Sequence, residues 1–109
     1  RIHELALVVK GDKRLDIYNA ALEQESLRDG AATIIISAVY ERTTGKYGER
    51  GMRYVHMEAG HAAQNVYLQA VSLNLGTVVI GAFHDSRVKK VLQMADNETP
   101  LYVMPLGRK

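Results

Sequence analysis

The sequence predicts a single small domain of the α+β class, built as α/β layers with helices packed on a central sheet. Two observations support this fold class. Apolar runs rich in β-branched residues alternate with segments of helical periodicity in the order β-α-β-α-β-α-β. The chain has 109 residues, of which 47% are hydrophobic and 24% charged, a balance typical of a globular domain with one modest core.

The first element is a short apolar run at residues 5–9, which a Lys-Gly-Asp turn stops, so we expect a strand there. Asp12 or Asp16 can then open a helix that continues to about Leu27. Gly30 follows that helix and is suited to a left-handed cap.

Residues 32–40 carry no charge and are rich in β-branched side chains, which predicts a central strand covered on both faces. The next thirteen residues, 41–53, read as an unusually long connection, and connections of that length are often functional. The basic residues in this connection either grip an anion or place an amine near a ligand, or they form a solvated surface, which composition alone favours. They are Arg42, Lys46, Arg50 and Arg53.

A long helix is predicted from Tyr54 to about Leu75, because apolar residues recur there at intervals of three or four. At a rise of about 1.5 Å per residue it spans roughly 30 Å, the width of a small domain. Its first turns are crowded with small residues that allow another backbone to approach. We therefore expect a central helix that packs on the sheet and on a second subunit. The small residues are Ala59, Gly60, Ala62 and Ala63.

The last third contains a buried strand at 77–80, a short helix from Asp85 or Ser86 to Met94, and a final strand at 101–105. The end of the first of these strands, Val79–Ala82, runs into Gly-Ala and leaves backbone N–H and C=O groups uncovered by side chains. A flat heterocycle could form hydrogen bonds there.

Composition excludes several classes of function. The chain has no cysteine, which removes disulfides, thiolate nucleophiles and cysteine metal sites and fits a reducing, cytoplasmic compartment. A net charge of +2 is too balanced to indicate nucleic acid or an anionic membrane, and no apolar run is long enough to cross a bilayer. His56 and His61 are five positions apart, about 140° around a helix, so we expect no metal site.

An ordered series of short blocks runs along nearly the whole chain: residues 3–5, 11–14, 20–24, 75–76, 81–85 and 100–108, together with two longer blocks. The longer blocks are Lys46-Tyr47-Gly48-Glu49-Arg50-Gly51 with Arg53-Tyr54, and Glu58-Ala59-Gly60-His61-Ala62-Ala63-Gln64-Asn65. In this series the chain resembles the C-terminal half of the nitroreductase-like flavoproteins, specifically the SagB-type dehydrogenase branch that includes the azoline (thiazole/oxazole) dehydrogenases.

The resemblance implies a nitroreductase-like fold and an FMN-dependent oxidoreductase. The long helix at 54–75 would form a homodimer interface, with the flavin bound between the subunits. The strand end formed by Val79, Ile80, Gly81 and Ala82 would lie beside the isoalloxazine ring. Arg108, with Lys109 as a weaker candidate, would hold the phosphate.

Lys46 and Tyr47 match a Lys-Tyr pair that is implicated in catalysis in the azoline dehydrogenases. The resemblance implies that Lys46 removes a proton from carbon while hydride passes to flavin N5, on a small organic or peptide-azoline substrate. That role requires an amine that is partly neutral near pH 7, which burial or a neighbouring cation would favour.

Two departures from the family pattern qualify the comparison. Glu23 stands where the family usually has glycine. The N-terminal half of the family, which brings further grip on the FMN, is missing, and the chain begins with Arg. We therefore expect residues 1–109 to be a single nitroreductase-like segment. A non-catalytic flavin-binding or dimerisation module remains the alternative function.

Overall fold

The computed structural model describes residues 11–108, so the strand expected at 5–9 lies outside the described residues, as does Lys109. The described helices and strands follow one another in this order: α1 (Arg14–Ala20), α2 (Glu25–Asp29), β1 (Ala32–Ala38), α3 (Glu41–Tyr47), α4 (Arg50–Ser72), β2 (Leu75–Thr77), α5 (Asp85–Val91) and β3 (Thr99–Arg108).

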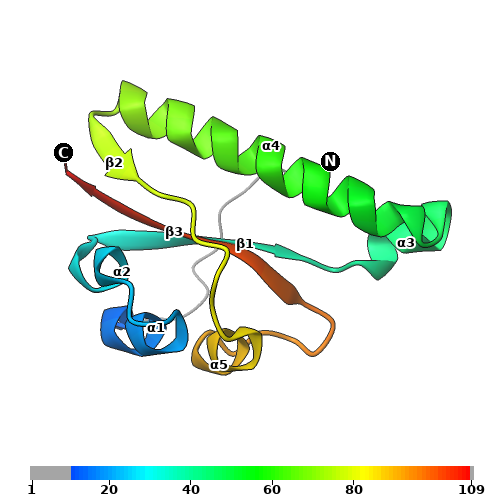
Figure 1. Cartoon of the computed structure of the whole chain (residues 1–109), viewed down its shortest axis with the longest axis horizontal. Helices are drawn as coiled ribbons and strands as arrows, with labels where there is room; N and C mark the ends of the chain where they lie inside the picture. Colours follow the sequence, from blue (N-terminus) through cyan, green and yellow to red (C-terminus); the bar gives the residue numbers. More distant parts are fainter. Residues whose placement is uncertain (1–10, 109) are drawn as a thin grey trace.

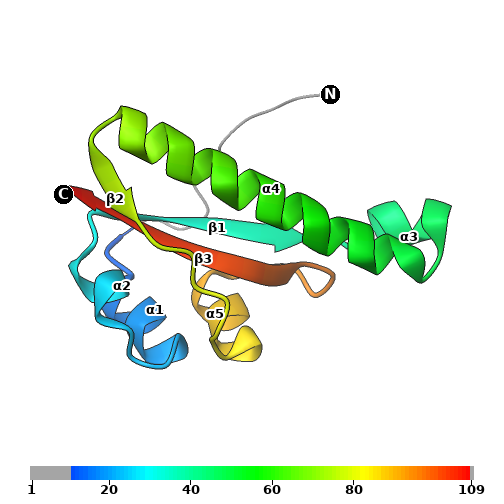
Figure 2. The same cartoon turned by 45° about the horizontal axis from the view of Figure 1, so that its top comes forward.

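The elements form three layers. In the middle layer β3 pairs antiparallel with β1 on one side and with β2 on the other. Helix α4 crosses one face of this sheet, whereas α1, α2 and α5 cover the other (Figures 1 and 2). The main apolar core lies between the three short helices and the sheet, around Leu27, Val88 and Val103. The α+β class predicted from the sequence is confirmed, and so is the long helix.

The expectation that 32–40 is the central strand is wrong for the described residues, because β3 lies between β1 and β2. Proline is usually confined to sheet edges, and β3 contains two prolines. The sheet accommodates both with irregularities. The register with β1 shifts between Ile36 and Ser37, the latter opposite Pro100. On the β2 side, pairing stops at Thr77 and resumes only at Ile80, which leaves Pro105 in the gap.

The single helix predicted from Asp12 to Leu27 is divided into α1 and α2. Leu22 and Glu23 break it, because both adopt left-handed backbone conformations with φ of 57° and 55°. The helix begins at Arg14, with Lys13 rather than Asp12 or Asp16 in the N-cap position and no side-chain capping bond. The Asp12 carboxylate accepts hydrogen bonds from the N–H and guanidinium of Arg14, and these bonds lower the pKa of Asp12 to about 2.

The predicted left-handed cap at Gly30 is wrong, since its φ is −69°. Close packing explains the glycine instead. A Cβ at this position would lie 3.1 Å from the carbonyl oxygen of Ser26 and 3.2 Å from that of Leu106. The chain therefore needs a residue without a side chain where α2 approaches β3.

The connection expected over 41–53 is not a loop. It consists of α3, a short turn and the first residues of α4. Gly48 forms the turn with a φ of 65°, and its N–H donates to the carbonyl of Thr44 over 2.7 Å. Gly51 then lets the two helices touch, because a Cβ there would lie 3.0 Å from the backbone nitrogen and Cα of Thr44. The long helix therefore begins at Arg50, four residues earlier than expected.

Helix α4 uses small residues to approach the sheet. Gly51, Ala59, Ala63 and Ala70 are its buried positions. Ala59 and Ala63, two of the small residues expected to let another backbone approach, are thus buried within this chain, whereas Ala62 is exposed. The opposite side of the helix presents an exposed row at intervals of three or four residues: Met57, His61, Gln64, Leu68 and Val71.

Candidate functional site

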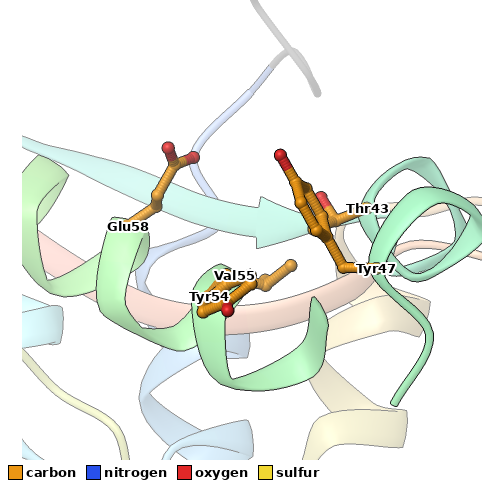
Figure 3. Close-up of a pocket in the computed structure, with 5 residues that line it drawn as sticks. All are labelled: Thr43, Tyr47, Tyr54, Val55 and Glu58. Carbon is orange, nitrogen blue, oxygen red and sulfur yellow. The ribbon is translucent and has the colours of Figure 1, made fainter. Parts of the chain in front are cut away.

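A shallow hollow of about 550 Å³ lies between α3 and the first half of α4. Thr43 and Tyr47 line it from α3, and Tyr54, Val55 and Glu58 line it from α4 (Figure 3). The contact at Gly51 holds the two helices together beside it. The hollow thus brings together two of the long sequence blocks that predict function, with Tyr47 from one and Glu58 from the other.

Two aromatic rings line this hollow, and a cation packs against each of them. The rings of Tyr47 and Tyr54 meet edge to face, with centroids 5.3 Å apart. The ammonium of Lys46 lies 5.3 Å from the centre of the Tyr47 ring. The guanidinium of Arg50 lies 5.8 Å from the centre of the Tyr54 ring, and its Nε donates to the Tyr54 hydroxyl over 3.0 Å. These cation–π contacts arrange both basic residues against the aromatic pair.

Lys46 itself is exposed, and so are Arg42, Arg50 and Arg53. These residues, expected on a glycine-rich loop, lie instead on helices. A single copy of the chain therefore does not bury the Lys46 amine. Burial is one of the two conditions, with a neighbouring cation, that would keep the amine partly neutral and so favour proton abstraction. The assignment of Lys46 and Tyr47 to catalysis stays a prediction.

The second predicted group of residues, Val79–Ala82, is tied to three other elements. Ile80 exchanges two backbone hydrogen bonds with Val103 of β3, of 3.0 and 2.9 Å. The N–H of Val79 donates to the hydroxyl of Tyr67 on α4 over 2.7 Å. The carbonyl of Ala82 accepts a 3.0 Å hydrogen bond from the side-chain amide of Gln24, between α1 and α2.

Two backbone donors in this segment point to no acceptor in the described part of the chain. They are the N–H groups of Gly81 and Ala82, and both residues are exposed. Arg108 ends β3, opposite Leu75 of β2, and is also exposed. It is five positions beyond Val103, the partner of Ile80, so the sheet separates it from Ile80 by about 17 Å.

The two predicted groups do not meet within one copy of the chain. Tyr47 packs on Tyr54, and Val79 on Tyr67, and these two tyrosines of α4 are thirteen positions apart. At the rise of an α-helix this separates the hollow from the strand end by about 20 Å. The resemblance implies that Lys46–Tyr47 and Val79–Ala82 serve a flavin bound between two subunits, and within one copy they lie at different positions along α4 (Figure 1).

Sequence reasoning missed Tyr67 and Gln24, the two side chains that hold the strand end. Gln24 belongs to a block that matches the family pattern, which is a signal that could have found it. Tyr67 lies within the predicted helix but outside the matching blocks, so only its contact with Val79 identifies it.

A separate polar pair joins the end of β1 to α4. The Tyr40 hydroxyl lies 2.8 Å from Nε2 of His56, and the two rings meet edge to face. Partial burial raises the pKa of Tyr40, and the nearby negative charge of Asp85 adds to that effect.

Within residues 11–108 no three histidine or acidic side chains gather in a way that could hold a metal ion. In the same range no helix is long and apolar enough to cross a membrane.

The chain has clear relatives. It is 48% identical over 107 residues to "Putative nitroreductase MJ1384" of Methanocaldococcus jannaschii, in an alignment that covers 98% of this chain and 53% of that protein. It is 30% identical to the trifolitoxin operon protein TfxC of Rhizobium leguminosarum biovar trifolii, covering 96% of this chain and 30% of the relative. The chain therefore spans about half, or less, of the length of these curated relatives.

Solved structures show the same fold. A nitroreductase-type protein from Anabaena variabilis superposes with a TM-score of 0.83 at 39% identity, over 90% of this chain and 20% of that chain. The Escherichia coli microcin synthetase McbBCD complex, with truncated pro-MccB17 bound, matches with a TM-score of 0.81 at 26% identity, over 94% of this chain and 39% of that chain. For the NADPH:FMN oxidoreductase of Vibrio harveyi, complexed with NAD+, the TM-score is 0.73 at 25% identity, over 88% of this chain and 45% of that chain.

The family comparison covers almost the whole sequence. The nitroreductase family profile matches residues 1–108. Together with the relatives and the shared fold, this match shows that the chain belongs to the nitroreductase family.

Proposed function

We propose that this chain is the C-terminal segment of a SagB-type, FMN-dependent oxidoreductase that acts on a small organic or peptide-azoline substrate. The observation that carries the proposal is the strand end at Val79–Ala82, which is held by β3, Tyr67 and Gln24 and presents backbone donors that have no acceptor within residues 11–108. The likeness to a microcin synthetase complex that binds truncated pro-MccB17 supports the peptide class of substrate.

The residues present fit FMN. The isoalloxazine ring carries carbonyl and ring-nitrogen acceptors along one edge, and the N–H groups of Gly81 and Ala82 are donors of the matching kind. Arg108, about 17 Å along the sheet, is a guanidinium suited to a phosphate at the far end of an extended ribityl chain. FMN, when bound, supplies a hydride acceptor at its N5 position.

The roles that we assign to the chain's own side chains follow from their positions. Lys46 takes the proton from the substrate carbon, and its ammonium packs against the ring of Tyr47, a residue that lines the hollow. Thr43 and Glu58 offer a hydroxyl and a carboxylate for orienting a polar substrate in the same hollow. A planar azoline ring can pack on the exposed edge of Tyr47, which is 51% exposed.

A second copy of the chain resolves the separation of about 20 Å between Lys46–Tyr47 and Val79–Ala82. The exposed row on α4 extends equally far in both directions from Gln64, since Met57 and Val71 are each seven positions away. A two-fold axis there would set the first half of one α4 against the second half of the other. Each copy would then carry its Lys46–Tyr47 pair toward the strand end of its partner.

The alternative, a non-catalytic flavin-binding or dimerisation module, has its own supporting observation. In a single copy the residues proposed to contact FMN lie together, but the proposed catalytic pair does not join them. A chain that binds FMN without turning over any azoline would be such a module. The two functions are therefore separated by turnover, not by cofactor binding.

The test is to add FMN to the purified chain, remove the excess by gel filtration and record the absorption spectrum. We expect the visible flavin bands to stay with the protein, and Arg108→Ala to weaken FMN binding by about tenfold through loss of a charged hydrogen bond. Lys46→Ala should abolish oxidation of a thiazoline peptide and leave FMN bound, whereas Lys90→Ala, an exposed lysine on α5, should change neither.

Each outcome has a distinct meaning. A wild-type protein that retains no FMN would overturn the proposed function as a whole. A Lys46→Ala variant that still oxidises the peptide would remove Lys46 from the catalytic role while leaving the flavin site intact. Bound FMN with no turnover by the wild-type protein would favour the module.

A further inference from the structure

The hydrogen-bond ladder between β3 and the segment 75–80 is interrupted just before Val79–Ala82, the edge proposed to contact the cofactor. The pairs Thr77 with Leu106 and Ile80 with Val103 keep the same register, so Val78 stands opposite Pro105. Ile80 and Val103 exchange both of their hydrogen bonds. The alternation of an antiparallel ladder makes the next such pair Val78 with Pro105, and proline has no N–H to donate.

The same alternation fixes the direction of the remaining N–H groups. Val79 and Gly81 flank Ile80, so their N–H groups point away from β3, to the outer edge of the strand. Tyr67 of α4 lies at this edge and accepts the N–H of Val79 over 2.7 Å. Within residues 11–108 the phenol therefore takes the place of a strand neighbour at this edge and leaves Gly81 as the next donor along it.

The other end of the edge is also held by a side chain. The amide nitrogen of Gln24 donates 3.0 Å hydrogen bonds to the carbonyls of both Ala21 and Ala82. The N–H of His84 donates to the carbonyl of Ala20 over 2.8 Å. Ile80 is held by β3 and Val79 by Tyr67, so Gly81 is the outward-facing donor that has no acceptor within residues 11–108. The N–H groups of Val78, Ala82 and Phe83 also have no acceptor in that range, but the alternation turns that of Ala82 toward β3.

We propose that Tyr67 is a positioning residue for the cofactor: its hydroxyl sets the edge that presents the Gly81 N–H and connects that edge to α4. The inference rests on the proposed function, because the ligand of this edge is taken to be the isoalloxazine ring of FMN. Tyr67 is half-buried and belongs to α4, so a movement of that helix is transmitted to Val79 through one hydrogen bond.

The test compares Tyr67→Phe, which removes only the hydroxyl, with Tyr18→Phe on α1. Tyr18 is also half-buried, and its ring lies under the Arg28 guanidinium, away from this edge. For Tyr67→Phe we expect FMN to dissociate about 3- to 10-fold more readily, as for the loss of one hydrogen bond, and the midpoint potential of the bound FMN to shift. In the FMN-free protein, amide hydrogen exchange at Val79 and Gly81 should become faster. Tyr18→Phe should change none of these.

The result that overturns the inference is an unchanged FMN affinity, potential and exchange rate in Tyr67→Phe while the wild-type protein binds FMN. If the wild-type protein binds no FMN, the proposed function fails, and the exchange measurement alone decides whether Tyr67 holds the edge. Should Tyr67→Phe not fold, 3,5-difluorotyrosine at position 67 keeps the shape and, at a mildly acidic pH where the fluorinated phenol stays neutral, weakens the hydroxyl as an acceptor. It should shift exchange and affinity in the same direction by a smaller factor, and no shift would overturn the inference.

Discussion

The contact between α3 and α4 predicts opposite effects for two glycine-to-alanine substitutions. At Gly51 a Cβ would lie 3.0 Å from the backbone nitrogen and Cα of Thr44 and 3.1 Å from the carbonyl carbon of Thr43. These are backbone atoms of a packed helix, so they cannot move aside as a flexible side chain would. At Gly45, in the middle of α3, a Cβ would meet nothing within 4 Å.

The magnitudes follow from two opposing terms. Alanine in place of glycine favours a helix by about 1 kcal/mol, whereas overpacking costs about 1–3 kcal/mol. Gly45→Ala gains the first term only and should stabilise the protein by about 1 kcal/mol. Gly51→Ala carries both and should destabilise it by about 1 kcal/mol. For a chain of this size, each kcal/mol changes the Tm by about 4 °C, so the two variants should differ by about 8 °C.

Thermal unfolding followed by circular dichroism measures this difference. Gly51→Ala should also displace α3, which carries Lys46 and Tyr47, and so weaken the Tyr47–Tyr54 contact that tyrosine fluorescence reports. If Gly51→Ala melts at the same temperature as Gly45→Ala or above it, the close approach of the two helices is not as described, and the hollow beside them loses its basis.

Three further predictions concern single residues. In a phenolate absorbance titration, Tyr40 should ionise above the usual tyrosine pKa of about 10, and Asp85→Asn should bring its pKa part of the way back. Because its pKa is raised by folding, the stability it contributes is complete below pH 10 and is lost as the pH rises through the raised value. Glu23→Gly should stabilise the protein by about 0.5–1 kcal/mol in urea unfolding by relieving a φ of 55°, and Glu23→Ala, which removes the same charge, should not. Gly60→Ala should stabilise a monomer by about 1 kcal/mol, since a Cβ there meets nothing within 4 Å, but should weaken the dimer in sedimentation equilibrium if a second α4 packs on that position.

Local sequence patterns predicted the elements that they dominate. The long helix and the last strand follow from periodicity and β-branched content, and Asp12 marks the helix start by its own hydrogen bonds. Helix α3 was missed because Thr43, Thr44 and Gly45 are weak helix formers, and it is the contact at Gly51 that holds it. The middle position of β3 was missed because the charge-free run at 32–40 indicated the central strand, whereas β3 contains two prolines, which are typical of an edge.

For the candidate site too, local sequence predicted one part, and the other part depends on contacts between distant residues. The pattern at Val79–Ala82 predicted uncovered backbone groups, because a strand that runs into Gly-Ala has that property locally. The distance of that edge from Lys46–Tyr47 depends on the length of α4 between Tyr54 and Tyr67, which no motif encodes. The role of Tyr67 depends on Pro105, thirty-eight positions away, interrupting the ladder, and such a coupling is visible only in three dimensions.

The most direct test of a site shared between two copies is complementation in mixed dimers. Lys46→Ala removes the proposed catalytic amine, and Arg108→Glu repels the cofactor phosphate, so each variant alone should be inactive in thiazoline-peptide oxidation. In a mixed dimer, one of the two sites would combine the intact Lys46 of the Arg108→Glu copy with the intact Arg108 of the Lys46→Ala copy. The other site would carry both substitutions. Random exchange makes half of the dimers mixed, so we predict about one quarter of wild-type turnover. Turnover no higher than that of the separate variants, with mixed dimers present, would contradict the shared site.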